Sequence, residues 1–419
     1  MSYKKIIPFI NASNEVKSNV VSLAFEYANS GADELIIYDY APNEEALEKL
    51  LVIGKEVVKL VDIPVTLGLF VKRFEDVKKA LYTGCNKVLI KYSLTNDDKV
   101  IKEASERFGN DKLVVELDEV TELTKDFSQK LKELGIDTIM IKHVDVSDNL
   151  RASIKESVLP ILIRDSLTRN DLAELMNIPN VESVSTNYFE HKEILKAKMA
   201  LKDANINVNT FDSQKEFKEF KLNSDGLLPV VVQDYKTNEV LMVAYMNEEA
   251  YNNTIQTGKM TYYSRSRKEQ WLKGDTSGHY QYVKSLSIDC DSDTLLAKVH
   301  QIGAACHTGN RTCFYTEIVK KEYDDTNPLT VFSDVYNIIM DRKNNPKEGS
   351  YTNYLFDKGI DKILKKCGEE ATEIVIAAKN PDAEELKYEI SDFLYHMMVL
   401  MAECGLDWDD ITKELAHRR

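Results

Sequence analysis

The sequence predicts a protein of three domains: an α/β barrel, an α+β metal-binding domain and an all-α helical domain. Three observations predict this order. Eight short β-branched runs alternate with amphipathic stretches before residue 210. Three cysteines and three aspartates gather between Asp289 and Cys313, and helical periodicity dominates after residue 329. We expect the domains to span residues 1–210, 222–323 and 329–419.

Composition excludes several classes of protein. The 419 residues carry a net charge of −15, whereas a nucleic-acid-binding surface needs a basic stripe. No apolar run approaches the length of a membrane span, and Ile6–Ile10 is too short for the core of a signal peptide. We therefore expect a cytoplasmic protein that binds neither nucleic acid nor membranes. Cys85, Cys367 and Cys404 stand alone and are expected to pack as small hydrophobic side chains.

The N-terminal region is expected to form a parallel sheet. Its strand candidates are Ile6–Asn11, Glu34–Tyr38, Pro64–Leu67, Lys87–Ile90, Leu113–Leu117, Thr138–Ile141, Pro160–Ile163 and Val181–Ser185. Because eight βα units close a (β/α)8 barrel, a barrel is favoured over a doubly wound open sheet.

This region resembles the histidine-biosynthetic barrel family, which includes the cyclase subunit of imidazole glycerol phosphate synthase and its isomerase relative. The resemblance rests on four segments: Ile7–Asn11, Ser30–Leu35, Asp62–Gly68 and Thr83–Val88. It implies a TIM-type barrel.

Departures from that family bear on activity. The family ends its first strand in an acid–base aspartate, where this chain has Asn11, and its phosphate-binding Gly-Gly turns are replaced by Leu67–Phe70 and Ile163–Ser166. An amide cannot shuttle protons, and bulky residues keep a phosphate away from the backbone. Asp118 matches the family's second aspartate, although a lone carboxylate at a strand end commonly serves as a turn or cap residue. We interpret the region as a degenerate barrel that serves as a scaffold; an active cyclase or isomerase is the alternative.

The middle region begins after a charged segment, Asp212–Ser224, which is predicted to be a linker. Leu227–Gln233 and Glu239–Tyr245 predict a hairpin, followed by a helix start at residues 246–250 and a strand that runs from Thr261 into a basic turn. The loop at residues 271–279 is rich in small residues and bounded by cationic and aromatic side chains. It could wrap a phosphate and stack a base; a solvated hairpin is the alternative.

Cysteines in this region predict a zinc site. Thiolates suit zinc, and Cys290, Cys306 and Cys313 would leave one tetrahedral position open, as a catalytic zinc requires. His307 could instead complete a structural zinc knuckle, but the Cys-x2-Cys pairs typical of such sites are absent from this sequence. Between the cysteines, Leu295–Ala305 is predicted to be helix-like.

Alternating aspartates flank Cys290. On an extended strand, Asp289, Asp291 and Asp293 would point to one face, with Cys290 on the other. Carboxylate oxygens suit magnesium, so we expect a magnesium site there.

Residues from about Gly226 to Tyr323 closely resemble phosphoribosyl-AMP cyclohydrolase. The shared motifs are Tyr-Ser-Arg-Ser-Arg, Trp-x-Lys-Gly-x-x-Ser-Gly, Asp-Cys-Asp-x-Asp and Cys-His-Thr-Gly-x-x-x-Cys, with Asp275 where the family commonly has Glu. The resemblance implies opening of the adenine ring between N1 and C6 by zinc-activated water, in a homodimer whose active sites form between subunits. His307 is expected to act in catalysis, as a base or as a ligand. The expected substrate-binding residues are Arg265, Arg267, Trp271, Lys273, Ser277 and His279.

Carboxylates recur on two helices predicted on either side of Asn380–Asp382. The expected magnesium ligands are Glu369, Glu370, Glu373, Glu389 and Asp392. Carboxylates that converge between helices repel one another unless cations lie among them; a solvated acidic face is the alternative. The residues expected to hold the two helices together are Ile374, Ile390, Phe393 and Met397.

Residues from about Leu329 to Arg419 resemble phosphoribosyl-ATP pyrophosphohydrolase, and the match includes Lys365 and Lys366, which are expected to bind substrate. The resemblance implies magnesium-assisted attack of water on the α–β phosphoanhydride, with Glu370 as a catalytic residue. The product of this reaction is the substrate of the middle domain. We therefore expect a bifunctional hydrolase of histidine biosynthesis that acts on nucleotides; a metal-binding regulatory protein with degraded sites is the alternative.

Overall fold

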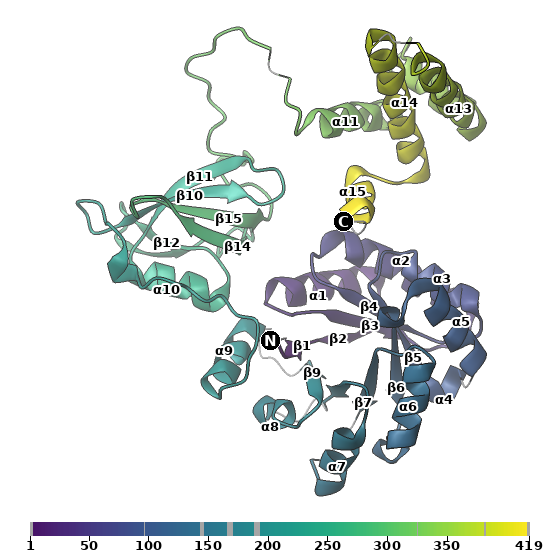
Figure 1. The fold of residues 1–419 in the computed structure, drawn as a ribbon. Helices are drawn as coiled ribbons and strands as arrows, with labels where there is room; N and C mark the ends of the chain where they lie inside the picture. The colour runs from purple at the N-terminus through teal and green to yellow at the C-terminus, as the bar shows by residue number, and fades with distance from the viewer. Residues whose placement is uncertain are drawn as a thin grey trace. The chain divides into compact units, whose positions relative to one another are not determined.

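The computed structural model describes residues 3–95, 97–142, 146–165, 171–187, 193–324, 326–380 and 383–416. The chain forms two compact units, Met1–Glu317 and Ile318–Arg419 (Figure 1). Ser166, Pro381 and Asp382, which belong to predicted turns, lie outside the described residues. Within the described ranges, no helix is both long enough and apolar enough to cross a membrane.

A parallel sheet of nine strands opens the first unit. The strands are β1 (Lys5–Ile6), β2 (Phe9–Asn11), β3 (Leu35–Asp39), β4 (Val65–Leu69), β5 (Lys87–Lys91), β6 (Leu113–Leu117), β7 (Thr138–Lys142), β8 (Ile161–Arg164) and β9 (Val181–Ser185). Neighbouring strands follow the order β1-β9-β8-β7-β6-β5-β4-β3-β2. Only Ile7 and Pro8 separate β1 from β2, so both edges of the sheet belong to one extended segment and the sheet closes as a TIM-like barrel. Each predicted strand overlaps a strand of the structure, and the consecutive order excludes the doubly wound alternative.

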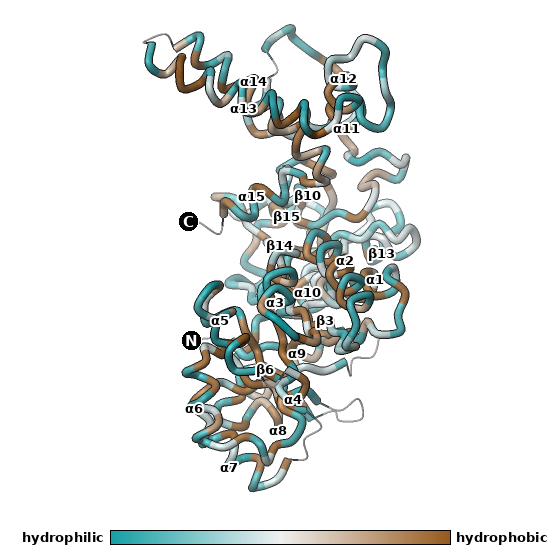
Figure 2. Tube along the Cα trace, turned by 90° about the vertical axis from the view of Figure 1, so that its right-hand side faces the viewer, coloured by the Kyte–Doolittle hydropathy of each residue, from teal (hydrophilic) through white to brown (hydrophobic). Residues whose placement is uncertain are grey.

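Helices surround this sheet. They are α1 (Lys17–Asn29), α2 (Glu44–Leu60), α3 (Phe74–Leu81), α4 (Tyr92–Thr95), α5 (Asp98–Phe108), α6 (Lys125–Glu133), α7 (Asp148–Glu156), α8 (Leu172–Met176) and α9 (Ile194–Asp203). Side chains alternate across each strand, so the nearly continuous hydrophobic runs of the strands supply two cores. One lies inside the barrel and includes Ile36, Val114 and Leu162; the other lies between strands and helices. Figure 2 shows this concentration of hydrophobic residues around β6.

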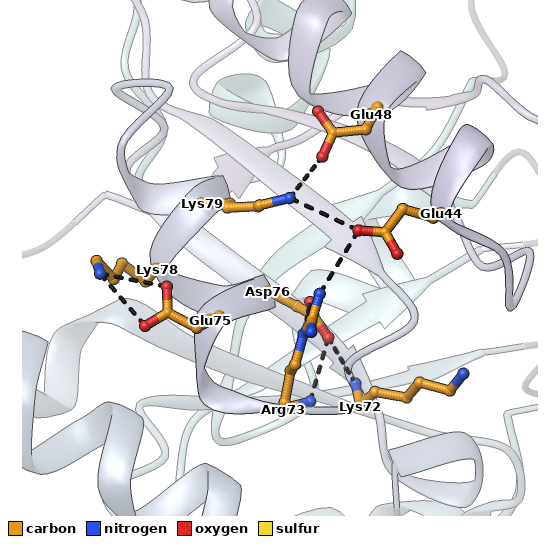
Figure 3. Close-up of polar contacts among 8 residues, drawn as sticks. All are labelled: Glu44, Glu48, Lys72, Arg73, Glu75, Asp76, Lys78 and Lys79. Atoms are coloured by element: carbon orange, nitrogen blue, oxygen red, sulfur yellow. Dashed lines mark hydrogen bonds and ion pairs between the residues drawn. The ribbon is translucent and has the colours of Figure 1, made fainter.

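An ion-pair network joins α2 to α3 on the outside of the barrel (Figure 3). Asp76 is buried, and its Oδ2 accepts hydrogen bonds from the backbone N–H groups of Lys72 at 3.0 Å and Arg73 at 3.1 Å. These bonds fix the first turn of α3. Glu44 of α2 lies 3.5 Å from the Arg73 guanidinium and 3.9 Å from Lys79, but these groups are exposed and contribute little to stability.

A four-stranded sheet organises the rest of the first unit. Its strands are β10 (Leu228–Asp234), β11 (Val240–Met246), β14 (Gln281–Ile288) and β15 (Leu295–Gln301). Helix α10 (Glu248–Thr257) follows β11, and β12 (Thr261–Ser264) pairs with β13 (Glu269–Leu272) in a separate hairpin. The sheet order is β11-β10-β15-β14. The predicted hairpin, helix start and basic turn are confirmed.

Two local predictions in this region are wrong. Leu295–Ala305 is not helix-like, because Leu295–Gln301 is a strand whose residues alternate between buried and half-buried positions, as period two requires. Asp212–Ser224 is not a free linker, because Phe217 and Phe220 are buried in the core of the sheet against Tyr251.

The second unit contains five helices within its described residues. They are α11 (Val331–Asn344), α12 (Tyr351–Lys358), α13 (Ile360–Ala377), α14 (Ala383–Cys404) and α15 (Trp408–Ala416). Their core includes Ile363, Cys367, Val399 and Ala402, and Figure 2 shows hydrophobic and hydrophilic residues alternating along α13 and α14. Met397 packs against this core as predicted, whereas Ile390 is 40% exposed and does not belong to it.

Candidate functional sites

A pair of thiols lies directly after strand β15. Cys306 is buried, its Sγ lies 3.0 Å from the Thr308 hydroxyl, and Cys313 is within hydrogen-bonding reach. The Thr308 hydroxyl and backbone N–H lower the pKa of Cys306. Burial raises the pKa of Cys313, and its hydrogen bond with Cys306 adds to the shift. Cys306 is therefore the thiol that more readily becomes the thiolate a zinc ion binds.

Lys273 connects the predicted substrate loop to this thiol pair. Its side chain is buried, and Nζ donates a hydrogen bond to the backbone oxygen of Ala305 at 2.8 Å. Burial lowers the pKa of Lys273, while the neighbouring Cys313 and Cys306 oppose the shift. His279 packs on Gly303, where an added Cβ would lie 2.6 Å from the imidazole ring. The loop at residues 271–279 and the thiol segment therefore lie side by side, as the predicted site requires.

Other predicted substrate residues are spread around the same loop. Arg265 lies over the ring of Tyr245 at 3.9 Å, and Trp271 packs against Tyr262 with ring centroids 5.5 Å apart. Arg267 is exposed and pairs with Glu269 at 3.3 Å. Ser277 Oγ accepts a hydrogen bond from the backbone N–H of His279 at 3.2 Å.

The aspartates converge, but not on a strand. Strand β14 ends at Ile288, and Ser292 has a positive φ of 66°, so Asp289, Asp291 and Asp293 lie in the turn before β15. Their carboxylate oxygens come within 4.8 Å of one another. The backbone N–H of Asp293 donates to Asp289 Oδ1 at 3.0 Å, and Lys221 lies 3.6 Å from Asp291. The alternation in sequence predicted the meeting of the carboxylates, whereas the turn that produces it was not predicted.

Cys290 does not join the other two cysteines. It is exposed, and among the described residues the groups of three or more possible metal ligands contain carboxylates only. One chain thus brings together two of the three predicted zinc ligands. His307 is also exposed, with Nδ1 4.0 Å from Cys306 Sγ.

Arg311 is a further candidate site residue, which was not predicted from the sequence. It lies between Cys306 and Cys313 and bonds to Asp234 Oδ2 and Glu239 Oε2, each at 2.9 Å. Its place inside the cysteine motif was the available signal. These ion pairs attach the thiol segment to β10 and to the turn that follows it.

In the second unit, Glu370, Glu373 and Glu389 bring carboxylate oxygens within 4.8 Å of one another. Glu370 is 4% exposed, whereas Glu373 is exposed. The hydrogen bond and the negative charge of Glu370 raise the pKa of Glu373, and Glu389 adds to the shift. A divalent cation would relieve this repulsion.

The remaining predicted residues of this site have other partners. Glu369 pairs with Lys365 at 3.0 Å and with Lys366 at 3.1 Å, and Lys366 also lies 3.1 Å from Glu370. Asp392 is exposed and is not part of the carboxylate group. The i,i+3 spacing of Glu389 and Asp392 therefore did not determine which of them meets α13.

His396 was also missed by the sequence analysis. It is 4% exposed, and its ring lies 3.6 Å from a carboxylate oxygen of Glu370 and 3.0 Å from the hydroxyl of Tyr351 in α12. A lone histidine on a helix offered no signal, because its partners come from helices distant in sequence.

The C-terminal mouth of the barrel is occupied by its own charged side chains. Asp118 lies 3.1 Å from Lys91 and 2.9 Å from Lys142, and Lys142 also lies 2.9 Å from the buried Glu116. Burial alone would raise the pKa of Asp118, but hydrogen bonds from Ser93, Lys142 and Lys91 hold it well below its usual range. A carboxylate this firmly ionised is a poor proton carrier near neutral pH.

Arg164 and Asn11, which also lie at the C-terminal ends of barrel strands, bind other residues of the barrel. The Arg164 guanidinium donates to the Tyr38 hydroxyl at 2.6 Å and lies 4.1 Å from the centroid of the Phe9 ring. Asn11 Oδ1 accepts the backbone N–H of Ser13 at 3.0 Å and so serves as a turn residue.

Comparison with known proteins gives three family matches. Residues 10–151 match the model of the histidine biosynthesis protein family, residues 242–315 that of phosphoribosyl-AMP cyclohydrolase, and residues 332–419 that of phosphoribosyl-ATP pyrophosphohydrolase.

Similar curated proteins carry the name "Histidine biosynthesis bifunctional protein HisIE". The one from Thermoanaerobacter pseudethanolicus is 53% identical over 210 residues, which cover 47% of this chain and 97% of that protein. The one from Bacillus subtilis is 47% identical over 204 residues, covering 49% of this chain and 97% of that protein. The Lactococcus lactis protein is 50% identical over 192 residues, covering 46% of this chain and 88% of that protein.

Proposed function

The chain belongs to the family of bifunctional histidine-biosynthesis proteins HisIE, and from this we propose that it catalyses two consecutive hydrolyses. The helical unit releases pyrophosphate from phosphoribosyl-ATP. The cyclohydrolase domain then opens the adenine ring of the phosphoribosyl-AMP product between N1 and C6. The observation that carries the proposal is that one chain gathers both the Cys306–Cys313 thiol pair and the Glu370–Glu373–Glu389 carboxylates.

For ring opening, the thiol pair fits a zinc ion. Cys306 has a lowered pKa and Cys313 lies beside it, so two thiolates could bind the metal from one side. A zinc ion held there would supply an activated water for attack at C6. Lys273 fixes the thiol segment through Ala305, and the loop from Trp271 to His279 would hold the nucleotide beside it. His307, exposed next to Cys306, could accept a proton during ring opening.

The third zinc ligand is proposed to come from a second copy of the chain. Cys290 is exposed and separate from the thiol pair, so a homodimer would let Cys290 of one chain complete the site of the other. Exposed apolar side chains on α13 and α14 also favour an oligomer: Val375 is 61% exposed, Ile376 is 55% and Tyr388 is 63%.

For pyrophosphate release, the three glutamates fit magnesium, which prefers carboxylate oxygens. Magnesium bound there would neutralise charge on the phosphates and orient the attacking water. Lys366, next to Glu370, would lie close to the phosphates, and Lys365 would add charge from the same turn. The turn of Asp289, Asp291 and Asp293 is proposed as a further magnesium site near the cyclohydrolase site.

A reciprocal pair of variants tests the two assignments. We expect Cys306→Ser to stop ring opening and to leave pyrophosphate release intact, because a neutral hydroxyl is a poor zinc ligand. Glu370→Gln should do the reverse, with a loss of roughly 100-fold or more in the rate of pyrophosphate release. Full ring opening by Cys306→Ser, or purified protein without zinc, would contradict the zinc assignment. Unchanged pyrophosphate release by Glu370→Gln at saturating magnesium would contradict the other.

A further inference from the structure

Within the first unit, the barrel contacts one face of the β14–β15 hairpin. Phe25 of α1 lies edge-on to Tyr282 of β14, with ring centroids 6.3 Å apart, and edge-on to His300 of β15 at 6.0 Å. Tyr282 and His300 are paired directly across the two strands. A single barrel side chain therefore contacts both strands of the hairpin.

An ion pair adds a second contact. Lys284 Nζ of β14 lies 2.7 Å from Asp62 Oδ2, in the turn between α2 and β4. Lys284 also lies 5.4 Å from the centre of the Tyr235 ring, which is itself 5.7 Å from His300. The barrel thus meets an aromatic and cationic surface made by β14, β15 and the residue that follows β10.

Helix α9 supplies a third contact. Gly258 follows α10 with a φ of 67°, and an added Cβ there would lie 2.8 Å from Leu195 and 3.1 Å from Phe211. This close approach leaves little room for α10 to shift against the barrel.

These contacts lie toward the end of the barrel at which its strands begin. Asp62 precedes a barrel strand, whereas Asp118 and Arg164 stand at the opposite, C-terminal ends of strands. In barrels of this type, the N-terminal end serves stability and the C-terminal end carries chemistry. The docking contacts therefore do not involve the mouth described above.

The contacted hairpin carries the parts of the cyclohydrolase site. The turn between its strands holds Asp289, Asp291 and Asp293, and β15 leads within a few residues from His300 through Gly303 to Cys306. Strand β14 is the last strand of the four-stranded sheet, and on its outer side it meets the short segment of residues 258–260. The N–H of Val283 donates to the backbone oxygen of Gly258 at 2.8 Å, and the N–H of Met260 donates to that of Gln281 at 2.9 Å. Because this segment follows α10, the barrel contacts on α10 and on the faces of β14 both act on the position of the hairpin.

We propose that the barrel is a brace for the cyclohydrolase site, with Phe25 and Asp62 as positioning residues that act through the β14–β15 hairpin. The inference rests on the proposed ring-opening function of that site. It assigns to the barrel a role in holding Cys306 and His279 in register, not one in chemistry of its own.

The experiment uses the full chain, in which pyrophosphate release serves as an internal control. The variants are Phe25→Ala, Asp62→Lys, Lys284→Asp and the double exchange of Asp62→Lys with Lys284→Asp. Glu56→Gln is the matched control, because Glu56 also forms a 2.7 Å ion pair, with Lys17, but both partners belong to the barrel. The readouts are kcat/KM for both reactions, zinc retained after dialysis against a weak chelator, and hydrogen exchange of the amides of residues 295–306.

We expect Phe25→Ala and each single charge reversal to lower kcat/KM for ring opening by roughly two- to tenfold, while that for pyrophosphate release stays within about twofold. Amide exchange in β15 should become faster and zinc retention should fall. The double exchange should recover ring opening, because the ion pair is re-formed with its charges swapped, and Glu56→Gln should resemble the parent.

Two results would overturn the proposal that the barrel is a brace. One is that Phe25→Ala and Asp62→Lys leave both the hydrogen exchange of residues 295–306 and the ring-opening activity unchanged. The other is that these variants lower both activities in the same proportion. If the parent protein did not open the ring, the proposed function would fail. Hydrogen exchange of the amides of residues 295–306 would still decide whether the barrel restrains the hairpin.

Discussion

His396 Nδ1 lies 3.6 Å from Oε1 of Glu370. Glu370 is the most buried of the three glutamates that converge between α13 and α14. The other ring nitrogen, Nε2, lies 3.0 Å from the Tyr351 hydroxyl, and Nδ1 is also 2.9 Å from the backbone oxygen of Asp392. Both nitrogens thus face fixed groups. The imidazole connects the first turn of α12 to the carboxylate that is expected to hold magnesium.

Removing this support should weaken metal binding. We expect His396→Asn to lower the affinity for Mn²⁺, used as a probe for magnesium, by about tenfold or more, because groups behind a ligand orient it. Titration calorimetry measures the affinity directly. Tyr351→Phe should have a smaller effect in the same direction, and Tyr354→Phe, at a 43% exposed position, serves as the control. Equal affinities in all variants would show that His396 only fills space.

Complementation tests the proposal that two chains share the zinc site. Cys290→Ser and Cys306→Ser should each abolish ring opening alone. Mixed in equal amounts after reversible dissociation, they should recover about a quarter of the parent activity, because half of the dimers are mixed and each holds one intact site. Absence of recovery, with mixed dimers demonstrated by mass spectrometry, would place the site within a single chain.

Magnesium affinity should depend on pH through Glu373. Its pKa is raised by Glu370 and Glu389, and a metal needs the deprotonated carboxylate. The affinity should therefore fall as pH decreases through this raised pKa, and metal binding should release protons wherever Glu373 is partly protonated in the free protein. Calorimetry in buffers of different ionisation enthalpy measures the proton release. Glu373→Gln should release fewer protons; an identical release would contradict the assignment.

Asp234 should make the thiol segment sensitive to acid. Burial alone would raise its pKa, but the backbone N–H groups of Thr237 and Lys236 and the charge of Arg311 hold the pKa below its usual value. A depressed carboxyl pKa contributes stability that is present above the unfolded-state pKa and is lost as pH falls through the folded-state pKa. We expect Asp234→Asn to lower the melting temperature at pH 7, and the difference from the parent to shrink from about pH 5 to about pH 3. If the difference in melting temperature stayed constant across this pH range, the stability would not come from the ionised carboxylate of Asp234.

The barrel is expected to have no turnover of its own. Asn11 is a turn residue, and Asp118 is held ionised between Lys91 and Lys142, so neither of these two described residues is poised to exchange protons. Assays of the full chain for imidazole glycerol phosphate formation and for aldose–ketose isomerisation should give no product above background. Turnover that is lost in Asp118→Asn would show that the barrel is an active enzyme.

Much of the fold follows from local sequence. The eight barrel strands were predicted from short β-branched runs that alternate with amphipathic stretches, and the helices on either side of residues 380–382 were predicted from their periodicity, because both signals are local to each segment. The Leu295–Gln301 strand was mistaken for a helix, since a short apolar run fits either period and only its pairing with β10 and β14 decides between them. Similarly, the phenylalanines of the expected linker revealed their role only once a core was present to bury them.

The sequence by itself determined which residues are the candidates for the chemistry: the thiols, the aspartates and the glutamates were all identified from their types and spacing. Tertiary structure decided which of them meet. It joined Cys306 to Cys313 without Cys290, selected Glu389 over Asp392, and placed His396 behind Glu370. It also brought Phe25 against His300 across a long stretch of chain. Spacing along the chain determines which side chains are neighbours within one helix or strand. Which residues of different helices or strands come into contact depends on packing angles and turns, and these cannot be read from the pattern of side chains in the sequence.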